Sequence, residues 1–156
     1  MIYAADEEFA KDFIKRTRNN YEFIKKYHRD LAVTQLINSA IGLLVIPKEQ
    51  HFDKIPQYLN DPDLYNKLCS CILINSYNED HNMSSIVRHL RNGISHAHMD
   101  FNAEQPPSKN LPLEIHTVKI TDTDNRKNAK FEIKLTIELL EEFLYAVSDV
   151  VINQGG

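Results

Sequence analysis

The stretch that most constrains the fold is Met83–Asn102, M-S-S-I-V-R-H-L-R-N-G-I-S-H-A-H-M-D-F-N. Its apolar residues recur at three- and four-residue steps, which places them on one stripe of a helix. We therefore predict an amphipathic helix from Met83 to about His98. Gly93 costs such a helix roughly 1 kcal/mol relative to alanine. A glycine at this point predicts a close backbone approach, or a helix that loosens near its end. The predicted apolar stripe comprises Met83, Ile86, Val87, Leu90, Ile94 and Ala97.

The opposite face of this helix is richer in polar groups than a passive surface requires. Asn92 and His96 are four positions apart and share a face. His89 lies three positions before Asn92 on that face. Arg91 and His96 are five positions apart, about 140° around a regular helix, so they are near each other without being stacked. These polar residues, with Arg88, form the candidate functional site.

Charge limits what the protein can bind. The chain has 156 residues and a formal net charge of -4, which fits one domain, residues 1–156, and gives no general affinity for nucleic acid. Any RNA contact must come from a local patch. One candidate patch is a row of cations on the first predicted helix, which includes Lys11, Lys15 and Arg18. A solvated helix face is the favoured interpretation of this row, and a path for a phosphate backbone is the alternative.

The cysteines, the N-terminus and the apolar runs of the sequence predict a cytoplasmic protein. Cys69 and Cys71 are too close on one predicted helix to form a disulfide easily, and we interpret them as reduced core residues. The N-terminus, M-I-Y-A-A-D-E-E, has no apolar run of a signal peptide. The longest apolar run, Ala40–Ile46, is too short to cross a bilayer, so we expect no membrane contact.

Periodicity predicts a mainly α fold, an antiparallel bundle of about five helices with a β-hairpin before the last helix. The hairpin insert covers about residues 113–136, with a loop at Asp122–Ala129. In its first strand, the spacing places Leu113 and Ile115 on one face and Val118 and Ile120 on the other, which a bulge would explain. The segment Ala103–Pro112 contains three prolines and is expected to be loop. The predicted helices are Asp6–His28, Leu31–Ile46, Asp61–Asn75, Met83–His98 and one that Thr136 caps; the predicted strands are Leu113–Thr121 and Lys130–Thr136.

Motifs for cofactor or metal chemistry are missing from the sequence. The four glycines form no phosphate-binding loop, and no G-x-S-x-G occurs. His81, His89, His96 and His98 are close in sequence but form no H-E-x-x-H, and His96 and His98 are expected on different sides of the helix. We therefore predict no metal site and no cofactor.

The motif H-L-R-N-G-I-S-H resembles the signature of the HEPN superfamily, which is Arg, then a polar residue that is often Asn, then His late in a helix. The resemblance continues outside the motif. The segment V-T-Q-L-I-N-S-A-I-G-L-L-V-I-P-K-E, followed by R-N-G-I-S-H-A, a hairpin and a last helix, is similar to compact single-domain HEPN proteins of prokaryotes. The resemblance covers most of the chain. One departure is that basic character is confined to local stripes here.

This resemblance implies a metal-independent endoribonuclease that acts as a homodimer, with the two motifs facing each other. Many such proteins are toxins or anti-phage effectors, so a cognate antitoxin is a candidate partner beside RNA. The residues that match the motif, Arg91, Asn92 and His96, are the expected catalytic set. The expected RNA contacts are Arg88, His89, His98, Lys11, Lys15 and Arg18.

Elementary chemistry agrees with that implication. RNA can be cut without a metal if its 2′-OH attacks the adjacent phosphate. That step needs a group that titrates near neutrality, such as His96, and a cation such as Arg91 for the charge on the phosphoryl oxygens. Two alternatives stay open: a catalytically silent HEPN-like module that only binds RNA or a nucleotide, and a structural or antitoxin-like dimer. Salt-sensitive RNA binding separates the last from the other two.

Overall fold

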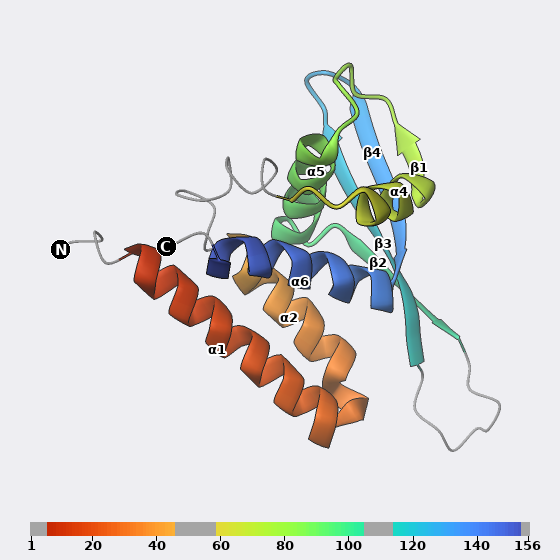
Figure 1. Cartoon of the computed structure of the whole chain (residues 1–156). Coiled ribbons are helices and arrows are strands. Elements are labelled where there is room, and N and C mark those ends of the chain that lie inside the picture. Colours follow the sequence, from red (N-terminus) through yellow and green to blue (C-terminus); the bar gives the residue numbers. More distant parts are fainter. Residues whose placement is uncertain (1–5, 46–58, 105–113, 154–156) are drawn as a thin grey trace. The chain divides into compact units, whose positions relative to one another are not determined.

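The computed structural model describes residues 6–45, 59–104 and 114–153. The chain divides into two compact units, one made of Met1–Asn60 with Phe143–Gly156 and the other of Asp61–Glu142. Five α-helices and four strands lie within the described residues, and helices predominate (Figure 1). None of these helices is long and apolar enough to cross a membrane.

The first unit is helical. Helix α1 (Asp6–Tyr27) leads through a 3₁₀ turn, η2 (Arg29–Leu31), into α2 (Ala32–Val45), and the two helices run side by side (Figure 1). Helix α6 (Ile137–Asn153) belongs to this unit from Phe143 onward. Its N-terminus is capped as predicted, since the Leu139 N–H donates to Oγ1 of Thr136 at 3.1 Å. The buried side chains of this unit include Ile14, Tyr21, Leu36, Leu43, Leu44, Phe143, Leu144 and Val147.

Helix α1 buries only part of its apolar residues. Phe9 and Tyr27 are at helical spacing with Tyr21 in the sequence, yet they are 59% and 60% exposed. The buried positions are Ala10, Ile14 and Tyr21. Aromatic residues occur on both sides of this helix, so spacing alone cannot say which side the core covers. The helix that follows begins at Ala32 because η2 takes up the expected start at Leu31; Ile46 lies outside the described residues.

The predicted mainly α fold with about five helices is confirmed, but the second unit contains a four-stranded antiparallel sheet in place of a single hairpin. The strands are β1 (Ile72–Asn75), β2 (Met99–Glu104), β3 (Glu114–Asp124) and β4 (Ala129–Thr136), in the order β1-β4-β3-β2. The expected hairpin, β3–β4, is confirmed at the centre of the sheet. The two edge strands were missed. Ala103 and Glu104, the first two residues of the predicted loop, belong to β2. Residues 105–113 lie outside the described chain.

The predicted bulge in the first hairpin strand is confirmed. Asn102 pairs with Thr117, whereas the next residue, Ala103, pairs with Ile115, so His116 is the extra residue of the bulge. An extra residue on one strand reverses which side chains face the core. The bulge therefore explains why the apolar residues of β3 change from odd to even positions along the strand. After the bulge, Val118 and Ile120 are buried.

Helix α4 (Pro62–Ser70) starts as predicted and ends earlier. Oδ1 of Asp61 accepts a hydrogen bond from the Leu64 N–H at 3.1 Å, and Pro62 occupies the first helical position. The helix does not continue to Asn75, because the carbonyl of Cys71 accepts the Lys134 N–H at 3.1 Å and the chain then pairs with β4. Cys69 and Cys71 are both free thiols.

Helix α5 (Met83–Ser95) is the helix that the sequence placed at Met83 to about His98. A capping box fixes its start: the Ser85 N–H donates to Oδ1 of Asn82, and the Asn82 N–H donates to Oγ of Ser85. Its predicted apolar stripe is buried from Met83 to Ile94, whereas Ala97 is exposed beyond the helix end.

Gly93 provides the close approach that the sequence predicted. A Cβ at this position would lie 2.4 Å from Cγ2 of Ile120 and 2.9 Å from the carbonyl oxygen of Thr121. The second contact is with backbone, which cannot turn aside as a side chain can. Glycine therefore lets α5 press its last turns directly against β3.

Candidate functional site

The end of α5 is a Schellman motif that sets the position of the two histidines. The Ala97 N–H donates to the carbonyl of Ile94 at 3.1 Å, and the His98 N–H donates to that of Gly93 at 2.8 Å. Ala97 has a φ of 56°, the left-handed conformation that this motif requires. His96 is the C-cap residue, so it is held by main-chain geometry at the very end of the helix.

This turn brings His96 and His98 together, contrary to the expectation that they point to different sides. Their ring centroids are 5.9 Å apart, and both side chains are exposed. The prediction failed because it extended the helix to His98, whereas the left-handed residue between them reverses the chain. The carbonyl of His98 then accepts the Thr121 N–H at 3.0 Å, which anchors the turn to β3.

His89 has a different role from the predicted one. It was expected on the polar surface as an RNA contact, but it is fully buried. Its Nδ1 lies 2.7 Å from Oδ2 of Asp122 and its Nε2 lies 2.5 Å from Oε1 of Glu79. The expected direct contact with RNA is wrong, since a completely covered ring cannot touch a ligand.

The imidazole of His89 therefore lies between two carboxyl groups, each within hydrogen-bond distance of one ring nitrogen. The ring also stacks on Phe131, with centroids 4.3 Å apart, and faces Tyr77 at 4.5 Å. Burial is the largest cause of a raised pKa for the Tyr77 hydroxyl, followed by the charges of Asp122 and Asp124, so Tyr77 stays neutral.

Asn92 links this buried cluster to the predicted catalytic residues. Its Nδ2 donates to Oδ2 of Asp122 at 3.2 Å. Its Oδ1 accepts from Nε and Nη2 of Arg91 at 3.3 and 3.1 Å. The Asn92 amide therefore orients the Arg91 guanidinium, and it is itself fixed by a carboxylate that His89 holds in place.

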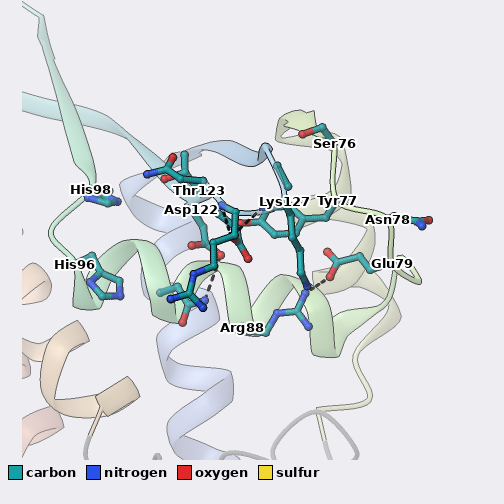
Figure 2. A pocket seen from close by; sticks show the side chains of 15 residues that line it. Ser76, Tyr77, Asn78, Glu79, Arg88, His96, His98, Asp122, Thr123 and Lys127 are labelled. Atoms are coloured by element: carbon teal, nitrogen blue, oxygen red, sulfur yellow. Dashed lines mark hydrogen bonds and ion pairs between the residues drawn. The ribbon is translucent and has the colours of Figure 1, made fainter.

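A cavity of about 1180 Å³ opens beside α5 in the second unit (Figure 2). Four of the predicted site residues on α5 or at its end line the cavity: Arg88, Asn92, His96 and His98. The guanidinium of Arg88 pairs with Glu79. Arg91 is half-buried and does not line the cavity. The other lining residues come from two loops and the strands beside them: Ser76, Tyr77, Asn78, Glu79, Asp122, Thr123, Asp124, Asn125, Arg126, Lys127 and Ala129.

The predicted cation row on α1 belongs to the first unit. Arg18 is engaged there, since its guanidinium pairs with Asp149 and lies 4.3 Å from the ring centroid of Tyr145. It is therefore not the free cation that the sequence suggested. Lys15 is exposed and Lys11 is half-buried, and their contact with RNA stays a prediction.

Sequence reasoning missed several residues that the fold brings to the site. Glu79 and Asp122 are 10 and 33 positions from His89, too far for any helical pattern to link them. Arg126 and Lys127 could have been predicted as surface cations from the sequence, because they are adjacent in the predicted hairpin loop. Within the described chain, no three His, Cys, Asp or Glu side chains are grouped as a metal ion would require.

Comparison with known protein families identifies the chain's family. A family model described as HEPN pEK499 p136 matches residues 1–156. No curated protein and no solved structure matches the chain significantly.

Proposed function

The chain belongs to the HEPN pEK499 p136 family, and from that premise we propose that it is a metal-independent endoribonuclease. The observation that carries the proposal is the position of His96. Its exposed ring lines a polar cavity at the end of α5, next to His98 and one helical turn beyond Asn92. By the same proposal, the protein acts as a toxin or an anti-phage effector, with an antitoxin as a further partner.

In the proposed reaction, the ribose 2′-oxygen attacks the adjacent phosphorus and the bond from phosphorus to the 5′-oxygen breaks. His96 of one copy takes the 2′-OH proton, and His96 of the second copy, in the dimer inferred below, gives a proton to the leaving 5′-oxygen. Arg91, oriented by Asn92, stabilises the negative charge on the phosphoryl oxygens. The products are a 2′,3′-cyclic phosphate, which can open to a monoester, and a free 5′-OH.

The test compares one labelled RNA with the same RNA that carries a single 2′-deoxy residue at the cut site. We expect the first to be cut and the second to be inert at that bond, because the nucleophile is missing. EDTA in a parallel reaction should leave the rate unchanged. Cleavage of the deoxy strand at the same bond, or loss of activity in EDTA, would indicate a metal-activated water instead.

We further infer a homodimer, which would bring a second copy of the motif to the substrate. Family membership supports this, as do large apolar side chains left exposed on the first unit, such as Phe23 at 57% and Ile41 at 45%. Light scattering at micromolar concentration should give twice the mass of the 18.1 kDa chain. A strictly monomeric mass would contradict the inference.

A further inference from the structure

The tip of the β3–β4 hairpin carries two cations with no role in the proposed chemistry. Arg126 and Lys127 line the same cavity as Asn92 and His96. Two hydrogen bonds hold the backbone of the turn that carries them. Oδ1 of Asp124 accepts the N–H of Arg126 at 3.0 Å and that of Lys127 at 3.3 Å. Both cations therefore project from a defined backbone.

Arg88 pairs with Glu79, whereas Arg126 and Lys127, the other two cations of the cavity, have no counter-ion among the described residues. Among the described residues, neither side chain has a hydrogen bond or ion pair. The nearby carboxylates are already engaged: Glu79 pairs with Arg88 and His89, and Asp122 with His89 and Asn92. The remaining carboxylate, Asp124, accepts only main-chain N–H groups within the described chain. The hairpin end of the cavity thus has two cations against one carboxylate, which leaves it a net positive charge.

The cavity lining points to a polar, extended ligand. Every lining residue except Ala129 carries a polar group, unlike the mainly apolar pockets that hold small molecules. The volume of about 1180 Å³ also exceeds the roughly 300–1,000 Å³ of such pockets. In Figure 2, His96 and His98 stand at one end, Lys127 and Tyr77 at the other, and Asp122 and Thr123 between them.

We propose that Arg126 and Lys127 bind backbone phosphates of single-stranded RNA, so that the strand runs from the hairpin through the cavity to His96. This rests on the proposed ribonuclease function and adds a substrate subsite to it. A single strand is required because only unpaired bases offer their edges to polar groups such as those of Thr123 and Asn78. Phosphates are the groups that two adjacent unpaired cations recognise most directly.

The experiment measures binding of a fluorescent RNA octamer by anisotropy over a range of salt, in a His96→Ala background that prevents cleavage. Replacing both cations, Arg126→Gln with Lys127→Gln, should weaken binding at least tenfold. It should also reduce the slope of log affinity against log salt by about 1.4, since each phosphate contact on a single strand contributes about 0.7. With His96 intact, the same double variant should raise KM and leave kcat unchanged.

Two controls test the position and the charge. Lys134→Gln removes an exposed lysine on β4 that does not line the cavity, and it should change neither affinity nor slope. The exchange Arg126→Lys with Lys127→Arg keeps both charges and should retain the affinity, which separates charge from damage to the turn.

If the parent binds and cuts RNA while the double glutamine variant keeps the full slope, the subsite is wrong and the ribonuclease stands. If RNA binds with the predicted slope change but is never cut, the subsite stands and the ribonuclease fails. Absence of RNA binding rejects both.

Discussion

His96→Ala is expected to slow RNA cleavage by roughly 100- to 10,000-fold, the contribution typical of one general acid or base. Arg91→Ala should cause a loss of similar order, because the phosphoryl charge would then lack its cation. Asn92→Ala should cost less, since the amide orients Arg91 and contacts Asp122 without carrying charge itself. Cleavage of one labelled RNA by matched amounts of each variant gives the comparison.

The fold should survive His96→Ala, because the ring is exposed and held only through the main chain of the helix end. The thermal midpoint should stay close to that of the parent. His28→Ala, which removes another exposed histidine remote in sequence from the motif, is the control and should cut at the parental rate. A His96→Ala variant that cuts as fast as the parent removes the catalytic assignment.

His89→Ala should have the opposite profile, with a large effect on stability. Removing the imidazole leaves Glu79 and Asp122, whose side chains are 15% and 11% exposed, without the group between them. Breaking a buried ion pair on one side costs roughly 3–5 kcal/mol. For a domain of this size, the midpoint should fall by roughly 6–20 °C.

The matched control is His98→Ala, which removes an exposed histidine from the same unit. Substitution of such a surface residue should change stability by no more than about 0.5 kcal/mol. Thermal unfolding followed by circular dichroism measures both variants side by side. Equal midpoints for His89→Ala and His98→Ala would mean that the buried cluster contributes nothing to stability.

Local pattern predicted the elements that carry strong local signals. The cap at Asp61, the bulge in β3, the cap at Thr136 and the close approach at Gly93 all follow from residue types at short spacing. Family membership was also predictable, because R-N-G-I-S-H sits among elements in the expected order.

The parts that failed depend on partners distant in sequence. Ile72–Asn75 continues the helical spacing of α4 and became β1 only because β4 offers an edge with which to pair. Met99–Glu104 lies at the opposite edge of the sheet, where Phe101 remains 43% exposed and no clear alternation marks a strand. His89 was placed on the surface because its two carboxylate partners come from a loop and from β3. The site residues themselves remain a prediction until the variants are measured.

The contact between Gly93 and β3 ties the spacing of the motif to the architecture of the sheet. One residue inserted between Gly93 and His96 would rotate His96 by about 100° and break the bond from the His98 N–H to the carbonyl of Gly93. The interval from Arg91 to His96 is thus constrained twice, by reactivity at the surface and by steric fit underneath. Divergent relatives should therefore vary the termini long before they change this interval.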